Sequence, residues 1–520
     1  MRSLFCLLIL FLTICVTATE SETLDRLLQD NWQKHALSPV AAADDATFVR
    51  RVYLDVSGRL PTLQEARKFI ADRNPDKRKK LISQLLDSPG YSDLMAMRYA
   101  DMFRIKSEFP INLWPNAVQT YHRYFKEAAA NNVPWNELVR ELLTADGSNF
   151  RVPAANFFRA SADRTPAGLA GAVGISLMGI RTAGMSPEDR EAFSMFFSCI
   201  GFKSTDEWKE EIVFLKRQAK TVHARTPDGK TFTINVPEQD PRQVFADWLL
   251  AEDNPFFARA FVNRTWHWIF GKGLIDPADN MPLPDTSFNW FGIFGCGKKA
   301  PHRNEEILNY LARDFIRSGY DIKQLINVIL NSKAYHAAWK TTGDQQQTAE
   351  ELFAVYPPHR MGAEVLVDAY SMVLGAHESY SSVIPEPFTF LPRNTPAVQI
   401  ADGSISSRSL DNFGRPSRDS GALDKRNNLV SASQRLFLLN SNWIYSRSRQ
   451  LPWRIFQRRK LSHNDRLNEI YLTVLSRYPT RQEIKAIADY QKKLPAKKKH
   501  EVWPDLVWAL INTREFMFHH

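Results

Sequence analysis

Cysteine is scarce in this sequence, and the strings that hold common cofactors through cysteine or histidine are missing. The 520 residues include four cysteines, two of which, Cys6 and Cys15, lie near the start of the chain. Covalent attachment of a c-type haem needs a Cys-x-x-Cys-His string, and none occurs, so we expect no in-chain haem and no other cofactor. The twelve histidines form neither an H-E-x-x-H string nor a pairing with cysteine at zinc-binding spacing, so the sequence predicts no metal site. Cys199 and Cys296 would either pair in an oxidising compartment or remain separate thiols.

Long apolar runs are absent too, except in the first residues. Arg2 precedes an apolar stretch from Leu4 to Val16 that is too short to be a stable membrane anchor. Val16-Thr17-Ala18 then places small residues before a cleavage site, which predicts residues 1–18 to be a signal peptide. The mature chain is therefore expected to be exported, periplasmic or extracellular, with no transmembrane segment. A lipid anchor at Cys15 is not expected, because Ile14 is larger than the residue that such processing prefers.

The mature chain has no strong excess of charge of either sign. Removing Arg2 from the 67 basic residues leaves 66 against 57 acidic residues, a net charge of +9. Basic residues are denser at 447–460 and 492–499, which is typical of solvated helix faces and loops. Export argues against a nucleic-acid partner, and the modest positive charge favours an acidic glycan or another envelope protein as the partner.

An internal repeat is the clearest organisational feature. Residues 53–65 read YLDVSGRLPTLQE and residues 471–483 read YLTVLSRYPTRQE, with eight of thirteen positions identical where unrelated segments would share roughly one. Thr62 and Thr480 are placed as helix N-caps, and the glutamate three residues after each completes a capping box. Apolar residues at helical spacing follow in both copies. The pattern predicts that helical hairpins are reused along the chain.

The remaining periodicity predicts a mainly α, multi-helical fold with one small β-hairpin. The hairpin is expected at 221–236, where side chains alternate on both sides of a Pro-Asp-Gly turn. We expect an N-terminal helical domain at 19–215, a hairpin linker at 216–240 and a C-terminal helical domain at 241–520. Helical spacing is found at 22–34, 76–87, 91–105, 116–130, 135–143, 188–199, 241–251, 256–270, 304–317, 321–331, 361–375, 431–449, 464–475 and 501–512.

Several longer strings resemble a known family. They include RRVYLDVSGRLPT, ELLTADGSNF, EWKEEIV, FADWLLAEDNPFFARAFVNRTWHWIFGKGLIDPADN, LINVILNSKAYH and FGRPSRDSG. Together they resemble the planctomycete-type pair of domains of unknown function, in which an N-terminal domain associated with cytochrome c precedes a planctomycete-specific C-terminal domain. The resemblance runs from about Asp45 to Phe518. Family members often carry a haem-attachment string, but residues 177–197 contain neither cysteine nor histidine, so this chain resembles a subtype that lacks it.

Two local patterns near the middle of the chain deserve a chemical interpretation. Residues 292–299 read GIFGCGKK, close to a phosphate-binding loop, but Lys299 replaces the hydroxyl residue that would bind magnesium, which favours a glycine-rich loop. His267 lies between two tryptophans just after Asn263 and Arg264. A histidine on an aromatic helix is usually a core residue, and a role in ligand binding is the alternative that we retain.

The segment 393–435 is long, irregular and polar, and such segments are usually functional or disordered. Arginine offers planar paired donors that match carboxylate, sulfate or phosphate groups. The alternative is that these arginines cross-link helix ends and buried carboxylates. The ligand-binding candidates are Arg408, Arg415, Arg418, Arg426, Asn427, Asn263, Arg264 and His267, and the acid–base candidates are Asp402, Asp419 and Glu364.

The sequence leaves three functions open. The first is an exported binding or scaffold protein with an arginine-rich polar groove for an acidic partner. The second is a hydrolase acting on an acidic or sulfated carbohydrate, which needs carboxylates or a histidine converging with the arginines in one cleft. The third, an accessory to a separate cytochrome c, is implied by the family resemblance alone.

Overall fold

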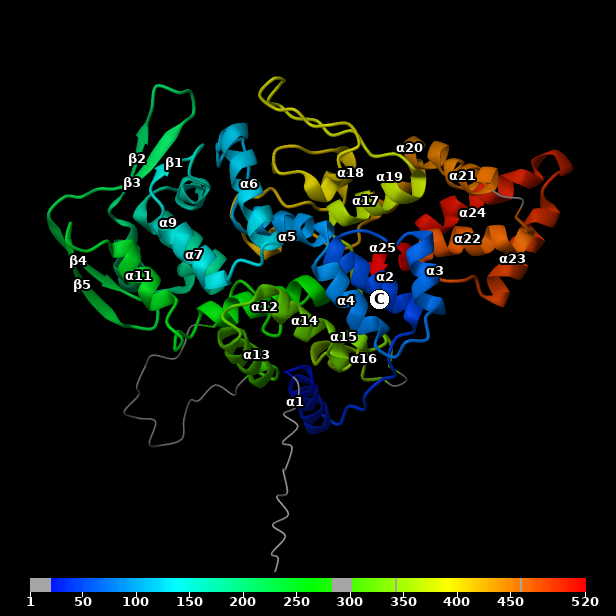
Figure 1. The fold of residues 1–520 in the computed structure, drawn as a ribbon, viewed down its shortest axis with the longest axis horizontal. Coiled ribbons are helices and arrows are strands. Elements are labelled where there is room, and N and C mark those ends of the chain that lie inside the picture. The colour runs from blue at the N-terminus through cyan, green and yellow to red at the C-terminus, as the bar shows by residue number, and fades with distance from the viewer. Residues whose placement is uncertain (1–19, 283–301, 342–343, 459–460) are drawn as a thin grey trace, which may run out of the picture.

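The computed structural model describes residues 20–282, 302–341, 344–458 and 461–520 (Figure 1). It is mainly α-helical with a few small sheets, as the sequence predicts. The predicted signal peptide at 1–18 with Cys15, the glycine-rich string at 292–299 and Cys296 lie outside the described residues.

The first of two hydrophobic cores is built from residues 24–356, with Ala401 added from later in the chain. Its apolar side chains come mainly from one face of each helix, in line with the spacing read from the sequence. The helices of this part are α1 (Glu20–Lys34), α2 (Asp45–Ser57), α3 (Leu63–Ala71), α4 (Lys77–Leu86), α5 (Pro89–Met102), α6 (Trp114–Ala130), α7 (Trp135–Thr144), α8 (Asn156–Arg159), α9 (Pro166–Val173), α10 (Pro187–Ser194), α11 (Pro241–Leu249), α12 (Phe257–Phe270), α13 (Glu305–Arg317), α14 (Ile322–Leu330), α15 (Lys333–His336) and α16 (Gln346–Glu351).

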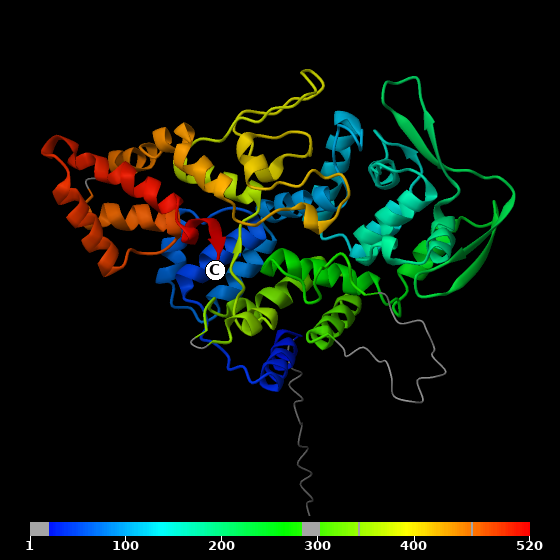
Figure 2. The ribbon, with the colours of Figure 1, turned by 180° about the vertical axis from the view of Figure 1, so that it is seen from behind.

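The second core gathers residues 361–517 and takes four side chains from the first part of the chain, namely Leu54, Leu60, Leu94 and Met97. Helices α2 and α5 therefore face both cores and form the seam between them. The helices of the second part are α17 (Ala363–Leu374), α18 (Arg408–Asn412), α19 (Ala432–Asn440), α20 (Asn442–Arg447), α21 (Gln450–Arg458), α22 (His463–Leu475), α23 (Arg481–Lys493), α24 (Val502–Ile511) and α25 (Arg514–Met517). The view from behind shows the C-terminus returning to the centre of the molecule, next to the blue helices of the N-terminal part (Figure 2).

The strands form three small antiparallel sheets. The predicted hairpin is confirmed as β4 (Lys220–Arg225) paired with β5 (Thr231–Val236). Its buried face, with Val222 opposite Ile234, belongs to the first core, because the alternating pattern leaves one apolar face that must be covered. The other strands are β1 (Gly147–Ser148), β2 (Ile200–Ser204) and β3 (Glu211–Leu215), in the order β1-β3-β2, and the pair β6 (His359–Arg360) and β7 (Phe518–His519).

The three-stranded sheet is not foreseen in the sequence. The helix expected at 188–199 ends at Ser194, a short 3-10 turn follows, and the chain enters β2 at Ile200. The apolar residues Phe196, Phe197 and Cys199 that extend the apparent helical pattern pack into the core from this turn. Apolar residues in a short turn satisfy the same spacing as a helix, so periodicity alone cannot place the boundary.

The repeated segments fold alike, as α2–α3 and α22–α23. Each first helix ends at a residue in the left-handed region, Gly58 or Ser476, and each second helix begins with a complete capping box. In both copies an arginine bonds the capping-box glutamate through two nitrogens and lies over the tyrosine that opens the repeat. The sequence repeat is therefore a repeat of one capped helical hairpin.

Replacing Thr480 by Ala is expected to lower the free energy of unfolding by about 1 kcal/mol, because the Glu483 N–H loses the oxygen that caps it. Thr62→Ala should give a similar loss, since its bond to the Glu65 N–H has the same length of 3.2 Å. Urea denaturation of the two single variants checks this. A loss in only one copy would show that the two hairpins are not energetically equivalent.

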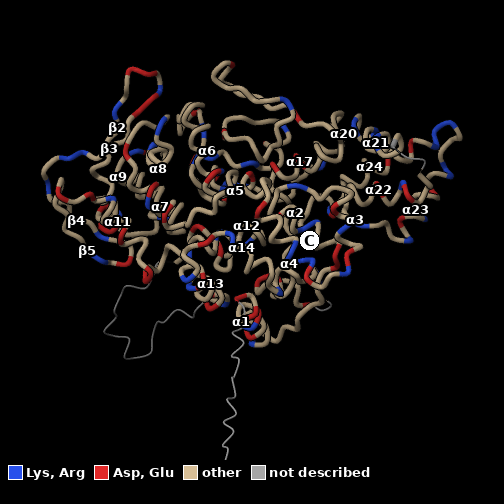
Figure 3. Tube along the Cα trace, in the orientation of Figure 1, with Lys and Arg blue, Asp and Glu red and all other residues tan. Residues whose placement is uncertain are grey.

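Charges of both signs are interspersed along the described trace (Figure 3). The β2–β3 turn is acidic, and the loop before α24, with Lys497 to Lys499, is basic. Within the four described stretches of the chain, no helix combines the length and the apolar character needed to span a bilayer.

Candidate functional site

A cavity of about 340 Å³ lies at the seam between the two cores. Its walls come from α2, α5, α12, the loop 276–279, β6, β7 and the irregular segment 416–428. Its volume is at the lower end of the range for small-ligand sites. Segments far apart in the sequence meet here, which is the usual setting of a functional site at a domain junction.

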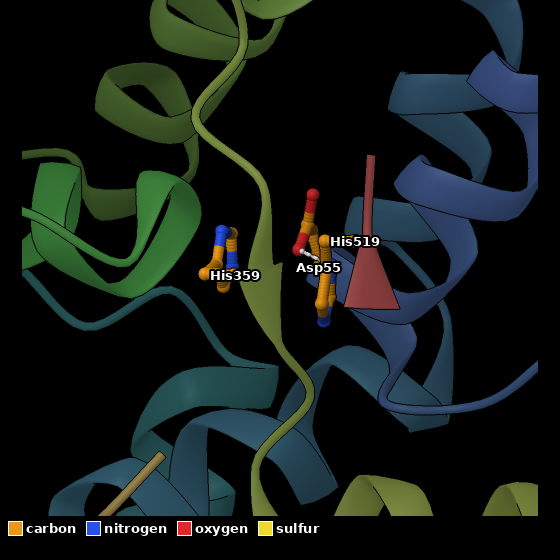
Figure 4. Close-up of side chains that lie close together, drawn as sticks. All are labelled: Asp55, His359 and His519. Atoms are coloured by element: carbon orange, nitrogen blue, oxygen red, sulfur yellow. Dashed lines mark ion pairs between the residues drawn. The ribbon is translucent and has the colours of Figure 1, made fainter. Parts of the chain in front are cut away.

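Three potential ligand side chains converge on one wall of this cavity (Figure 4). Asp55 comes from α2, and His359 and His519 face each other as the paired residues of β6 and β7. One oxygen or nitrogen from each of the three lies within 4.8 Å of those of the other two. The two imidazole rings stack with centroids 4.6 Å apart and planes inclined by 10°. Because directly opposite residues in a strand pair project to the same side, the short β6–β7 ladder fixes both rings on one face.

The Asp55 carboxylate is buried and held by hydrogen bonds. The Tyr335 hydroxyl donates to its Oδ2 atom over 2.8 Å, while Oδ1 lies 2.8 Å from His519 Nδ1. Burial raises the pKa of Asp55, but the contact with His519 and the tyrosine hydrogen bond outweigh it and hold the pKa below its ordinary value. The wall of the cavity therefore carries a fixed negative charge.

The His359 ring has a defined orientation. Its Nδ1 atom lies 3.0 Å from the Pro357 carbonyl oxygen, and since a carbonyl can only accept, Nδ1 carries the proton. The other ring nitrogen then keeps its lone pair free. Burial and the adjacent His519 ring lower the pKa of His359 to about 3, so the ring is neutral. Gly271 ends α12 at φ +70° directly against this ring, and a Cβ there would come within 2.6 Å of His359 Cγ.

Two arginines in the cavity wall lack an acidic partner. Arg98 of α5 donates to the carbonyls of Asp55 and Trp268, and Arg264 of α12 donates to the carbonyl of Ile175. Within the described residues, neither guanidinium has a carboxylate at ion-pair distance, although both line the cavity. Burial lowers the pKa of each to about 10, and at neutral pH both remain charged. The carboxylates of Asp55 and Asp279 raise the pKa of Arg98 and Arg264 respectively, but from beyond ion-pair distance. A buried cation without a close counter-charge is costly, so these groups favour an anion in the cavity.

Three arginines of segment 393–435, Arg415, Arg418 and Arg426, are bound by acidic groups and carbonyls within the protein. They therefore act as the internal cross-links that the sequence offered as the alternative to ligand binding. Arg418 bonds Asp101 at 2.8 Å, and Arg426 bonds both Asp101 and Glu364. Arg415 approaches Glu364 at 3.4 Å and donates to the carbonyls of Asp402 and Ile405. The expectation of a groove of free guanidinium groups is thus corrected for these three, which cross-link the segment to α5 and α17.

The acid–base candidates have structural roles as well. Glu364 is completely buried, and although burial raises its pKa, Arg426 and Arg415 lower it to about 2. It pairs with these two arginines, whereas Arg360, four residues earlier in β6, donates to backbone carbonyls. Asp402 is buried and accepts from the Ser107 and Ser404 N–H groups, outside the cavity wall.

Some predicted binding residues lie away from the cavity. Asn263 is buried, and its amide bonds both the carbonyl and the N–H of Ile275, which anchors the loop after α12. Arg408 and Asn427 are exposed, and neither lines the cavity. The predicted residues that do line it are Arg264, His267, Arg418, Asp419 and Arg426, with Asp419 paired to Lys106 at 2.7 Å.

Sequence reasoning missed Asp55, His359 and His519, because no local spacing joins residues that lie hundreds of positions apart. One signal was available in the repeat. Where the first copy reads Tyr-Leu-Asp, the second reads Tyr-Leu-Thr, so Asp55 corresponds to Thr473. A buried carboxylate in only one copy indicates a role that the hairpin itself does not need.

Comparison with protein families matches both halves of the chain. Residues 23–172 match a family described as PSCyt2, Protein of unknown function (DUF1549), and residues 241–491 match PSD1, Protein of unknown function (DUF1553). The chain belongs to the planctomycete-type family with these paired domains of unknown function. Comparison with curated proteins and with solved structures finds no match.

Both matched regions of this chain contribute to the cavity. Asp55 and Arg98 lie in the DUF1549 region, whereas Arg264, His267 and His359 lie in the DUF1553 region. His519 follows the second matched region and reaches the site through β7. Neither matched region alone supplies the charged and imidazole groups of the cavity, so the site is complete only when both regions are folded together.

Proposed function

We propose that the paired-domain cavity binds an anionic small group, such as the acidic or sulfated unit of a glycan. The observation that carries this proposal is the pair of cavity-lining arginines, Arg98 and Arg264, without acidic partners. A bound carboxylate or sulfate would supply the missing counter-charge and accept charge-assisted hydrogen bonds. This proposal replaces the extended arginine-rich groove expected from the sequence with a preformed cavity. It retains the acidic partner and an exported location, for which residues 1–18 are the basis.

A hydrolase acting on that anionic unit is the second candidate. A carboxylate and imidazoles converge with the two arginines in one cavity, and this is the arrangement that a hydrolase needs. His267 lines the same cavity from α12, one turn from Arg264, and burial keeps its pKa below the ordinary value. A neutral imidazole facing a bound anion is suited to accept a proton.

Calorimetric titration of the full mature chain with sulfate and with glucuronate tests the binding proposal. Arg98→Gln and Arg264→Gln should each weaken binding by about 10-fold to 100-fold, because each removes one charge-assisted donor. Arg140→Gln is the matched control, since Arg140 is exposed, pairs with Asp247 and lies outside the cavity wall. Equal affinity in all four proteins, or no binding by the wild type, would refute the proposal.

The same proteins separate the binding protein from the enzyme. Chromogenic sulfate esters and glucuronides should release their chromophore only if the chain is a hydrolase, and Arg264→Gln should then reduce turnover in parallel with binding. Binding without release of product would establish the first candidate and dismiss the second.

A further inference from the structure

We propose that Asp55, His359 and His519 bind one divalent transition-metal ion at the wall of the cavity. This inference goes beyond anion binding, because it concerns different residues and is measured without any anion. Two imidazoles and a carboxylate form a donor set suited to zinc, ferrous iron, cobalt or manganese rather than calcium. The three donor atoms already lie within 4.8 Å of one another, and those of Asp55 and His519 are 2.8 Å apart.

The contact between His519 and Asp55 is a close ion pair, with His519 Nδ1 2.8 Å from Asp55 Oδ1 (Figure 4). The angle of this contact falls outside ordinary hydrogen-bond geometry, so both atoms face the same small space. His519 is only 7% exposed, so water does not satisfy this nitrogen readily. A cation that binds between these two atoms would replace the ion pair with two metal–ligand bonds. Two ligands about 2.0–2.2 Å from a tetrahedral zinc ion are about 3.3–3.6 Å apart, so the donor atoms of Asp55 and His519 must separate by about 0.5–0.8 Å when the ion binds.

Hydrogen bonds from neighbouring residues orient the proposed ligands, as they do around metal sites in general. A carbonyl fixes the His359 tautomer through Nδ1, leaving Nε2 free, and the Tyr335 hydroxyl holds one oxygen of Asp55 so that the other faces His519. Such hydrogen bonds set ring orientation and ligand basicity in metal sites. The Gly271 backbone packs against the His359 ring and restricts its rotation.

Three protein ligands beside a cavity leave coordination positions open. Structural zinc sites are closed by four protein ligands, whereas catalytic sites keep a position for water or substrate. The cavity wall that carries Asp55, His359 and His519 also carries Arg98 and Arg264, so an anion could approach the open side. A metal ion there would lower the pKa of a bound water toward neutrality, which is the chemistry that the hydrolase candidate requires.

The test is a calorimetric titration of the metal-stripped full chain with Zn²⁺, without sulfate or glucuronate. We expect one Zn²⁺ per chain, and Asp55→Asn should weaken binding by at least about 100-fold because it removes the charged ligand. Tyr335→Phe should weaken it by about 10-fold through loss of the orienting hydrogen bond. His223→Ala is the matched control, because His223 lies on the exposed side of the β4–β5 hairpin.

Asp55→Asn is nearly isosteric, and although loss of the His519 ion pair should lower its melting temperature in chelator, a cooperative unfolding transition shows that the fold is kept, which separates loss of a ligand from loss of the fold. Co²⁺ loading gives a second reading, since its visible absorption should change in His519→Gln and not in His223→Ala. Wild-type stoichiometry below one, or Zn²⁺ affinity that Asp55→Asn and His519→Gln leave unchanged, would overturn the proposal. Neither outcome would bear on anion binding, because the sulfate and glucuronate titrations can be run in chelator, without metal.

Discussion

Replacing Glu364 by Gln is expected to destabilise the protein by about 3–5 kcal/mol, the largest loss that we predict for a single near-isosteric substitution. Glu364 is completely buried and accepts from Arg426 at 2.6 and 3.1 Å, with Arg415 at 3.4 Å. The amide cannot neutralise these guanidiniums. Arg426 would keep Asp101, but Arg415 would lose its only carboxylate partner among the described residues. Urea unfolding at neutral pH measures the loss.

Glu306→Gln is the matched control for this substitution. Glu306 also pairs with a basic residue, Lys34, but both side chains are more than half exposed and 3.5 Å apart. Such a surface pair contributes about 0–1 kcal/mol, so the control should be nearly neutral. If Glu364→Gln were as mild as Glu306→Gln, the arginines of segment 393–435 would not be the internal cross-links that their contacts indicate, and an open groove would return as the better description.

The second large effect concerns pH and the carboxyl group of Asp368 on α17. Burial raises the pKa of Asp368 from 3.8 to about 7, with Glu364 and Asp93 adding to the rise, although the N–H groups of Ala397 and Val398 oppose it. The folded state therefore holds the proton more tightly than the unfolded state. The stabilisation from this group is complete below about pH 4 and is lost as pH rises through 7.

In Asp368→Asn, which cannot titrate, this loss should be absent. The stability of the wild type relative to the variant should fall by an amount on the order of 4 kcal/mol between pH 4 and pH 8. Urea unfolding of both proteins across this range measures it, and subtraction removes the titration of other groups. A constant difference would mean that the two backbone N–H groups hold Asp368 ionised throughout.

The hairpins and most helix positions could be predicted from the sequence because they depend on local contacts. The capping boxes at Thr62 and Thr480 need only a hydroxyl and a glutamate three residues apart, and both are present as expected. The sheet β1-β3-β2 could not be predicted, since Gly147 and Ser148 pair with residues more than sixty positions away. Register between such short strands is set by the surrounding core, which no local pattern describes.

The candidate site was foreseen only in part, for a related reason. Arg264 and His267 attract notice as polar residues on an aromatic helix, and both line the cavity. Asp55 and His519 are separated by most of the chain and become neighbours only when β7 pairs with β6. The arginine-rich segment stands out in the sequence because its charges are dense, yet its arginines form ion pairs with Asp101 and Glu364 inside the protein. Composition indicates which groups are available, and only tertiary packing decides whether they face a ligand or one another.

If the cavity between the paired domains is the functional site of this chain, it should hold both a metal ion and an anion. An anomalous difference map from crystals of the full mature chain soaked in Zn²⁺ and selenate measures this. We predict a zinc peak about 2.0–2.2 Å from donor atoms of Asp55, His359 and His519, and a selenium peak within hydrogen-bond reach of Arg98 and Arg264. Peaks confined to exposed residues such as His223, with neither ion in the cavity, would contradict the account.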